Sequence, residues 1–265
     1  MKKVTTKTLL SMKQAGEKFA TLTAYDASFA KVLDNAGVDV ILVGDSLGMV
    51  IQGHETTVPV SMDDMVYHAS CVASSTRRAM LMVDMPFMSY TNIDQALMNA
   101  ARLMQEGGAH IIKLEGGSSQ IPIVQSLSGQ GIPVCAHIGL QPQSVHKMGG
   151  YRVQGRSNEQ AAQMLMDAEN LENAGADILL MECVPAPLAK KISANLSIPV
   201  IGIGAGNDTD GQVLVLQDVL GITPDAAPSF SKNFMAEADD IPSAISSFVN
   251  SVKDGSFPSS GHSFS

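Results

Sequence analysis

The sequence predicts a (β/α)₈ barrel, a closed ring of eight parallel strands surrounded by helices. Short, continuously apolar segments alternate about eight times with helix-forming segments along the 265 residues. Apolar runs without polar alternation are typical of parallel strands that are covered on both faces. Glycines that stop a helix just before a strand recur at Gly37, Gly108 and Gly175. Single barrels of this class have about 250 residues, so the length fits.

The strands are expected in order along the chain, and each ends at polar residues or glycine. The second of them, Val40–Val43, runs directly into Gly44, Asp45 and Ser46. Glycine lets the backbone turn sharply there, beside an acid and a hydroxyl group. Asp and Ser are also common helix caps, so a capping role is the alternative for this pair. We place the strands at residues 19–25, 40–43, 79–83, 110–114, 133–136, 177–181, 199–203 and 213–216.

Helices are expected between these strands. Ser61 followed by Asp63 and Asp64 is a typical helix start, with a cap and acids in the first turn. A longer excursion, rich in glycine and polar groups, spans 141–157 and follows the fifth strand. The expected helices cover residues 27–35, 61–74, 92–106, 158–174 and 187–196, with a lead-in at 5–16 and an amphipathic helix at 241–252.

No change in composition marks a domain boundary. We therefore expect a single barrel domain over residues 1–265, with a short N-terminal helical lead-in and a C-terminal helical tail. A doubly wound open sheet is the alternative fold, because the spacing of strands and helices alone does not exclude it.

Composition limits the possible functions. The net charge is −9 and only 16% of residues are charged, so no basic surface is available to neutralise the phosphates of a nucleic acid. No apolar segment is long enough to span a bilayer or to act as a signal peptide. Cys71, Cys135 and Cys183 show no paired spacing, which favours reduced, mostly buried thiols. We expect a cytoplasmic protein that binds small molecules.

Polar residues stand where the predicted strands end, and in a barrel such side chains converge on one mouth. Three carboxylates in one site repel one another unless a cation or a proton is shared between them. Oxygen ligands alone favour Mg²⁺, so Asp45, Asp84 and Glu115 are the candidate metal ligands; separate solvated or capping acids are the alternative. The residues at strand ends are Asp26, Asp45, Ser46, Asp84, Lys113, Glu115, His137, Glu182 and the turn Gly204–Gly206.

The other residues at this mouth suggest roles in substrate binding and proton transfer. Lys113 lies two residues before Glu115, so both side chains point to the same face of a strand. Lys113 can hold a substrate carboxylate, fill a salt bridge or form a Schiff base; the acidic cluster favours the metal-dependent route. His137 either contacts a substrate oxygen or satisfies hydrogen bonds in the core. Glu182 follows an apolar strand, where burial raises basicity and suits proton transfer.

A glycine-rich turn, Gly202-x-Gly204-x-Gly206, follows the seventh strand. Such a turn can bind phosphate, and close packing of the backbone at the end of the barrel explains it equally well.

Long segments, spread over nearly the whole chain, resemble the ketopantoate hydroxymethyltransferase family. The matching segments are LTAYDASFA at 22–30, ILVGDSLGMVIQGH at 41–54, VDMPF at 83–87, IIKLEGG at 111–117, PVCAHIGLQPQSV at 133–145, GGYRVQGR at 149–156, LLMECVP at 179–185 and PVIGIGAGNDTDGQVLVLQD at 199–218. The resemblance implies a phosphoenolpyruvate/pyruvate-like barrel that assembles as a homo-oligomer, usually a decamer. It also implies Mg²⁺ and a one-carbon transfer from 5,10-methylenetetrahydrofolate to 3-methyl-2-oxobutanoate. The product is 2-dehydropantoate, on the route to pantothenate and coenzyme A.

The resemblance also implies residue roles. Asp45, Asp84 and Glu115 match the family's metal-binding positions, and Glu182 matches its proposed catalytic base. Ser46, Lys113 and His137 match positions at the substrate, which Asp45 and Asp84 also contact. Ser229 stands where the family pattern has lysine, and residues 262–265 are also variable, so contacts of this tail with folate remain open.

Two other function classes remain. A Mg²⁺-dependent lyase or aldolase acting on another 2-oxo acid would share the carboxylates but needs no folate. A barrel that serves only as a scaffold or binding module leaves the convergent acids unexplained.

Overall fold

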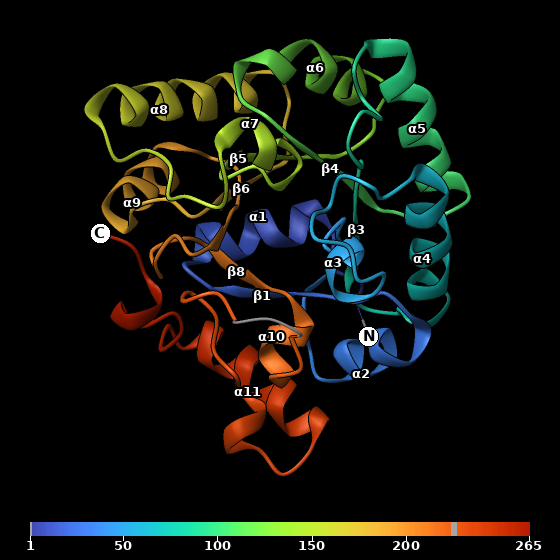
Figure 1. Cartoon of the computed structure of the whole chain (residues 1–265), viewed down its shortest axis with the longest axis vertical. Coiled ribbons are helices and arrows are strands. Elements are labelled where there is room, and N and C mark those ends of the chain that lie inside the picture. The colour runs from blue at the N-terminus through green and yellow to red at the C-terminus, as the bar shows by residue number, and fades with distance from the viewer. Residues whose placement is uncertain (1, 224–226) are drawn as a thin grey trace.

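The computed structural model describes residues 2–223 and 227–265, and its centre is a closed barrel of eight parallel strands in chain order (Figure 1). Each strand pairs with the next one along the chain, and β8 closes the ring by pairing with β1. Closure confirms the predicted barrel and excludes the open sheet. The strands are β1 (Phe19–Thr23), β2 (Val40–Val43), β3 (Met80–Asp84), β4 (Ile111–Glu115), β5 (Val134–Gly139), β6 (Ile178–Glu182), β7 (Val200–Ile203) and β8 (Gly211–Leu214).

Helices surround the barrel, most of them where the sequence predicts them. Ser61 caps α4 as expected: its hydroxyl accepts from the Asp64 amide, and the Asp64 carboxylate accepts from the Ser61 amide. The helix α11 packs on β1 between α2 and α10 and so completes the outer ring. The helices are α1 (Thr6–Ala15), α2 (Ala27–Asn35), α3 (Leu47–Val50), α4 (Met62–Ser75), α5 (Ile93–Gln105), α6 (Ile121–Gly129), α7 (Val145–Met148), α8 (Asn158–Asn173), α9 (Ala186–Asn195), α10 (Leu216–Leu220) and α11 (Ile241–Lys253), with short 3₁₀ turns at Ser118–Gln120, Pro142–Ser144, Met235–Glu237 and Ser260–His262.

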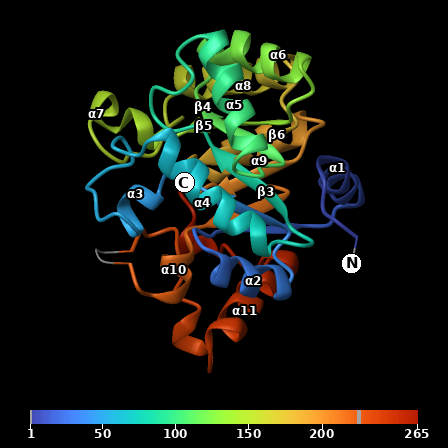
Figure 2. The same cartoon turned by 90° about the vertical axis from the view of Figure 1, so that its right-hand side faces the viewer.

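The two ends of the barrel are covered differently. At the end where the strands begin, Lys13 of α1 donates to the carbonyl oxygens of Ser193 and Ile198 and to the carboxylate of Asp210, each over 2.9 Å. Figure 2 shows α1 at this end and α3 and α7 at the opposite end, where the strands finish. Because α1 closes one end of the barrel, access to the interior is from the carboxyl ends of the strands.

The eighth strand lies two residues earlier than predicted. It begins at Gly211, where a Cβ atom would stand 2.5 Å from the Phe19 ring of β1, so only glycine allows the two strands to approach. Residues 215 and 216 do not extend the ladder, because the Leu216 amide donates instead to the Thr23 hydroxyl over 3.0 Å. This hydrogen bond ends β8 and lets α10 begin at the mouth of the barrel.

The remaining sequence expectations concern the three cysteines and the lack of a membrane-spanning segment. Cys135 and Cys183 are buried and Cys71 is half-buried, and all three are free thiols. Within residues 2–223 and 227–265, we found no helix with the length and apolarity needed to cross a bilayer.

Candidate active site

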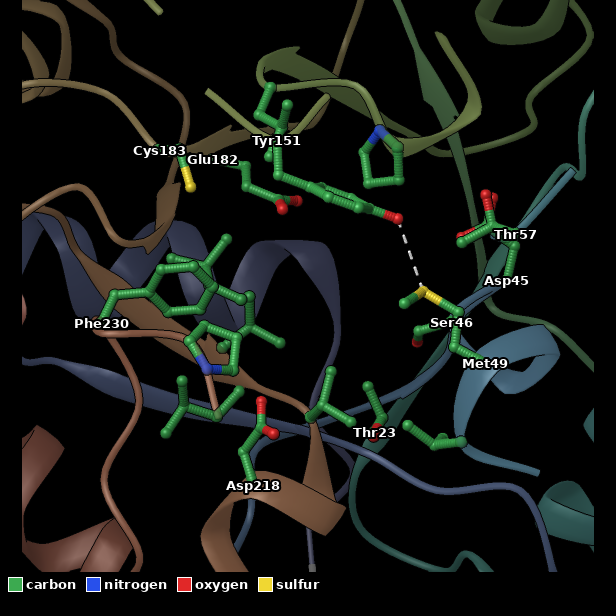
Figure 3. A pocket seen from close by; sticks show the side chains of 18 of the residues that line it. Thr23, Asp45, Ser46, Met49, Thr57, Tyr151, Glu182, Cys183, Asp218 and Phe230 are labelled. Carbon is green, nitrogen blue, oxygen red and sulfur yellow. Dashed lines mark hydrogen bonds between the residues drawn. The ribbon is translucent and has the colours of Figure 1, made fainter. Parts of the chain in front are cut away.

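A cavity of about 810 Å³ opens at the carboxyl ends of the strands. Figure 3 shows it from close by, with Glu182 and Asp45 on two of its sides and Asp218 on a third. Five of the polar side chains that line it are almost fully buried, each no more than 4% exposed: Asp45, Asp84, Lys113, Glu115 and His137. Ser46 and Glu182 line the same cavity, so all seven residues predicted from the sequence converge there.

The strand register explains why these side chains meet. Asp84 of β3 lies opposite Lys113 of β4, and Glu115 of β4 lies opposite His137 of β5. Lys113 and Glu115 are two residues apart on one strand and therefore face the same way, as the sequence predicts. The apolar strands thus bring a cation, two acids and a histidine together at the barrel mouth.

The carboxylates of Asp45 and Asp84 form the acidic centre of the site. The Asp45 amide donates to Asp84 Oδ2 over 3.1 Å. A Cβ atom at Gly44 would lie 3.0 Å from the Ser46 hydroxyl and 3.4 Å from Asp84 Oδ2, so glycine permits this close approach. Burial and then the charge of Asp84 raise the pKa of Asp45 to about 7. Neither Asp45 nor Ser46 acts as the helix cap considered from the sequence, because α3 has no side-chain cap.

Lys113 balances part of this negative charge. Its Nζ atom donates to Asp84 Oδ1 over 2.8 Å. Burial alone lowers the pKa of Lys113, but the nearby carboxylates of Asp84, Glu115 and Asp45 outweigh it and hold the pKa above its ordinary value. The raised pKa keeps Lys113 protonated near neutral pH, which favours carboxylate binding over the Schiff-base alternative, since a Schiff base requires a neutral amine.

Gln143 joins Asp45 to Glu115, and sequence reasoning missed it. Its backbone amide donates to Glu115 Oε2 over 3.1 Å, and its side-chain Nε2 donates to Asp45 Oδ2 over 2.7 Å. Tyr90 fixes the other end of the amide by donating to Gln143 Oε1 over 2.6 Å. Gln143 lies in the 3₁₀ turn after β5, inside the excursion that the sequence marks only as polar. No spacing rule identifies it.

His137 lies between two carboxylates. Its Nδ1 atom is 3.7 Å from Glu115 Oε1, and its Nε2 atom is 3.4 Å from Glu182 Oε2. Burial and then the charge of Lys113 hold the pKa of His137 well below its ordinary value, so the imidazole is neutral and these contacts are not ion pairs. Burial raises the pKa of Glu182 to about 8, although Lys113 opposes the shift. A carboxyl group with this pKa is suited to accepting a proton near neutral pH.

The remaining predicted residues have smaller or different roles. The Ser46 hydroxyl is 2.8 Å from the Tyr25 hydroxyl, a partner that the sequence did not suggest. Asp26 does not join the site, because its side chain caps α2 by accepting from the Phe29 amide. His54, in the loop after α3, also lines the cavity.

The glycine-rich turn after β7 is explained by packing. A Cβ atom at Gly202 would lie 2.8 Å from the Thr209 hydroxyl, and one at Gly206 would lie 2.6 Å from Ala186. Gly204 has a φ of +59°, and a Cβ atom there would meet the rings of Phe230 and Phe264 at 3.0 Å. Each glycine therefore makes room for a neighbouring side chain, which supports the packing interpretation over phosphate binding.

The donor set fits a hard divalent cation. Asp45, Asp84 and Glu115 offer only oxygen, and Glu115 Oε1 is buried without a hydrogen-bond partner in the described residues. As the side chains stand, no three Asp, Glu, His or Cys residues of the described chain lie close enough together to hold an ion. Mg²⁺ in proteins is commonly bound by only one or two carboxylates and keeps several waters. Two carboxylate ligands, Asp45 and Asp84, are therefore enough for a Mg²⁺ site.

The mouth of the cavity is crossed by Tyr151, from the excursion after β5. Its hydroxyl donates to the sulfur of Met49 in α3 over 3.6 Å, drawn as the dashed line in Figure 3. Phe230 and Asp218 line the wall on the far side from Asp45. Phe264 lines the same cavity, with its ring centroid 6.4 Å from that of Phe230. Sequence reasoning did not identify Tyr151, Phe230, Phe264 or Asp218 as part of the site.

Comparison with solved structures supports the type of barrel. Phosphonopyruvate hydrolase aligns with a TM-score of 0.63 over 83% of this chain and 84% of that chain, at 14% identity. A 2,3-dimethylmalate lyase, described as a member of the PEP mutase/isocitrate lyase superfamily, aligns with a TM-score of 0.56 over 79% of this chain and 80% of that chain, at 16% identity. These similarities concern the fold alone and agree with the predicted (β/α)₈ barrel.

Comparison of sequences is more specific. The curated 3-methyl-2-oxobutanoate hydroxymethyltransferase of Alkalilimnicola ehrlichii is 60% identical over 261 residues, covering 98% of this chain and 94% of the relative. The protein of the same name from Marinobacter nauticus is 57% identical over 261 residues, covering 98% of each chain. The family model for ketopantoate hydroxymethyltransferase matches residues 3–260. The resemblance seen in the sequence is thereby confirmed, and the chain belongs to the ketopantoate hydroxymethyltransferase family.

Proposed function

We propose that this enzyme transfers a hydroxymethyl group from 5,10-methylenetetrahydrofolate to 3-methyl-2-oxobutanoate, giving 2-dehydropantoate for pantothenate biosynthesis. Its family membership supports the reaction. The observation that carries the chemistry is that Asp84, its hydrogen-bond partner Lys113, and Glu182 all line one cavity. This arrangement combines binding of an acidic substrate with a group able to accept a proton.

Asp45 and Asp84, with Glu115 beside them, are the residues that would hold Mg²⁺. When bound there, Mg²⁺ supplies Lewis-acid stabilisation of the negative charge that develops on the keto oxygen of the substrate. Gln143 keeps Asp45 and Glu115 in place through its two hydrogen bonds. Partners of this kind orient metal ligands and usually matter for affinity.

Lys113 and Ser46 are suited to hold the substrate carboxylate. Lys113 remains charged, and its ammonium group can donate to a second carboxylate while it keeps the bond to Asp84, because it has three donors. The Tyr25 hydroxyl can donate to Ser46, which leaves the one O–H donor of Ser46 for the substrate carboxylate.

Glu182 is suited to remove the proton from C3 of the substrate. The C3–H bond breaks, the proton passes to the Glu182 carboxylate, and the electron pair remains on the C3–C2–O unit. C3 then bonds to the methylene carbon of the donor, both C–N bonds of that carbon break, and the oxygen of a water molecule becomes its hydroxyl oxygen. One water proton stays on this oxygen, and the other water proton and the proton held by Glu182 restore the two N–H groups of tetrahydrofolate. Neutral His137, 3.4 Å from Glu182, adds no charge that would lower the basicity of Glu182.

Formation of 2-dehydropantoate tests this proposal directly. The purified enzyme is incubated with 3-methyl-2-oxobutanoate and Mg²⁺, with and without tetrahydrofolate and formaldehyde, and products are followed by NMR. Product that requires both the metal and tetrahydrofolate supports the proposal. Cleavage or condensation of another 2-oxo acid without folate would replace it with the lyase or aldolase alternative.

The cellular context proposed here is a cytoplasmic homo-oligomer, a decamer by resemblance to the family. Three free thiols fit a reducing compartment. Large apolar side chains are exposed on the outer helices and loops, among them Tyr67, Met88 and Met98, at 64%, 58% and 70% exposure. Such side chains are typical of contact surfaces when they gather together. Native mass spectrometry distinguishes ten subunits from a monomer.

A further inference from the structure

The cavity is larger than a five-carbon acid requires. Its volume of about 810 Å³ lies within the range of about 300–1,000 Å³ that is typical of pockets for whole drug-sized ligands. The residues that serve 3-methyl-2-oxobutanoate occupy the side formed by β2 to β6. The wall formed by the segments after β7 and β8 has no role in binding or activating the 2-oxo acid. It carries both an acid and aromatic rings.

Asp218 is the acid of this wall. It lies in α10, is 5% exposed, and points into the cavity across from Glu182 (Figure 3). The Thr223 hydroxyl donates to its Oδ1 atom. In the part of the chain that the structure describes, Asp218 has no Lys, Arg or His partner, and its Oδ2 atom accepts no hydrogen bond. A buried carboxylate without a cation is costly unless a ligand supplies donors.

Two phenylalanines form the aromatic part of the same wall. The rings of Phe230 and Phe264 meet edge to face, with centroids 6.4 Å apart and an interplanar angle of 76°. Both pack against Gly204, and the Ala186 amide donates to the Phe264 carbonyl oxygen over 2.8 Å. The segment 259–265 is thus attached at the start of α9, close to Glu182, and both rings are only half-buried. Their accessible surface faces the cavity.

The chemistry of this wall matches one part of the one-carbon donor. A pterin ring is a flat heteroaromatic system whose 2-amino group and N3–H are adjacent donors on one edge. A carboxylate can accept both in a bidentate arrangement, as it accepts the two donors of a guanidinium group. Aromatic side chains contribute by packing against the ring system.

We propose that Asp218 accepts hydrogen bonds from the 2-amino and N3–H edge of the pterin, while Phe230 and Phe264 pack against the ring. This assignment rests on the proposed folate-dependent function and extends it to the donor-binding side of the cavity. It also gives the segment 259–265 a place in the binding site. Burial raises the pKa of Asp218, and the hydrogen bond from Thr223 opposes that shift.

The substitution Asp218→Asn tests this proposal because it keeps the size of the side chain and removes its charge. We expect KM for 5,10-methylenetetrahydrofolate to rise about 10- to 100-fold, the range for a lost hydrogen bond to a charged group. Exchange of the C3 proton, measured without folate, should change less than about threefold, because Asp218 does not contact the 2-oxo acid. Asp208→Asn is the matched control, since Asp208 pairs with Lys190 and does not line the cavity. It should alter neither quantity.

A ligand analogue sharpens the assignment. A tetrahydrofolate analogue without the 2-amino group should bind the wild-type enzyme at least about tenfold more weakly than tetrahydrofolate. The Asp218→Asn variant should discriminate much less between the two ligands. Phe230→Leu, which keeps an apolar side chain, should weaken both ligands alike because it affects ring packing only.

The outcomes separate this proposal from the proposed function. Unchanged donor KM in both Asp218→Asn and Phe230→Leu would overturn the pterin assignment while folate-dependent product formation in the wild type stands. Loss of C3 exchange in Asp218→Asn, with a folded protein, would also overturn it by placing Asp218 at the 2-oxo acid. If the wild-type enzyme makes no product from tetrahydrofolate, the proposed function itself fails.

Discussion

Lys113 Nζ lies 2.8 Å from Asp84 Oδ1 inside the barrel, and neither residue is more than 4% exposed. The lysine therefore occupies the position of a counter-ion for an acid that we assign to Mg²⁺ binding. Lys113 and the metal ion repel each other there, while both attract the 2-oxo acid. This relationship predicts opposite effects on the two ligands when the lysine is removed.

Lys113→Met should bind Mg²⁺ at least about tenfold more tightly, because loss of a unit charge a few ångströms away is worth several kcal/mol at a buried site. Its KM for 3-methyl-2-oxobutanoate should rise, because the carboxylate loses its cation. Calorimetric titration with Mg²⁺ is done well above neutral pH, where the acids of the site are ionised. Lys190→Met, on the surface, is the control. Weaker Mg²⁺ binding in Lys113→Met would contradict the predicted repulsion.

The raised pKa of Glu182 predicts a pH dependence of stability in the metal-free protein. Glu182 has a pKa of about 8 in the folded chain and 4.5 as its ordinary value. Between these values the folded protein retains a proton that the unfolded chain releases. The stabilisation from Glu182 is therefore complete at acidic pH and is lost as the pH rises towards about 8.

Glu182→Gln removes this titration. Between about pH 5 and about pH 8.5, the free energy of unfolding should fall less in the variant than in the wild type. The two decreases should differ by more than about 1 kcal/mol, because one pKa unit corresponds to about 1.4 kcal/mol. Urea unfolding at several pH values measures the difference. Glu237→Gln, whose side chain is 71% exposed, should follow the wild type. Parallel pH profiles for wild type and Glu182→Gln would show that the Glu182 pKa is not raised.

Mg²⁺ should stabilise the folded protein through Asp84. At a concentration of 100 times Kd, a ligand adds about 2.7 kcal/mol, which for a chain of this size raises Tm by about 5–10 °C. Asp84→Asn should lose most of this shift, whereas Glu182→Gln should keep it, because Glu182 is not assigned to the metal. Differential scanning calorimetry with and without Mg²⁺ separates the two variants. An equal shift in Asp84→Asn and wild type would remove Asp84 from the metal site.

Gln143 should matter for metal binding although it is not itself a ligand. Gln143→Met keeps the length of the side chain and removes the donors to Asp45 and the acceptor for Tyr90. Loss of such a supporting partner typically lowers metal affinity about 10- to 100-fold. Gln163→Met, on the exposed face of α8, is the control and should have no effect. Unaltered Mg²⁺ affinity in Gln143→Met would mean that Asp45 is held in place without the Gln143 side chain.

Much of the fold and of the candidate site could be predicted because both depend on the strands. Continuous apolar runs define parallel strands, and the residue at the carboxyl end of each strand must lie at one mouth. Asp84, Lys113 and Glu182 were found in this way. The approach also placed Asp26 at the mouth, wrongly, since a residue just beyond a strand can turn away to cap a helix.

The rest of the site depends on contacts that no local pattern encodes. Gln143 and Asp218 lie in loops and short helices, and their positions depend on the Tyr90 and Thr223 side chains that hold them. Phe264 reaches the cavity from a distant segment, where the Ala186 amide donates to its carbonyl oxygen and its ring packs against Phe230. The end of β8 was misplaced for the same reason, because the side chain of Thr23 terminates it.

Removal of the C3 proton by Glu182 is the step on which the proposed chemistry depends most. We would compare wild type and Glu182→Gln by NMR, following deuterium exchange at C3 of 3-methyl-2-oxobutanoate with Mg²⁺ and without folate. General-base catalysis contributes about 10²- to 10⁴-fold, so the variant should exchange slower by that factor while Mg²⁺ still raises its Tm. Exchange at the wild-type rate in Glu182→Gln would contradict the assignment of Glu182 as the base.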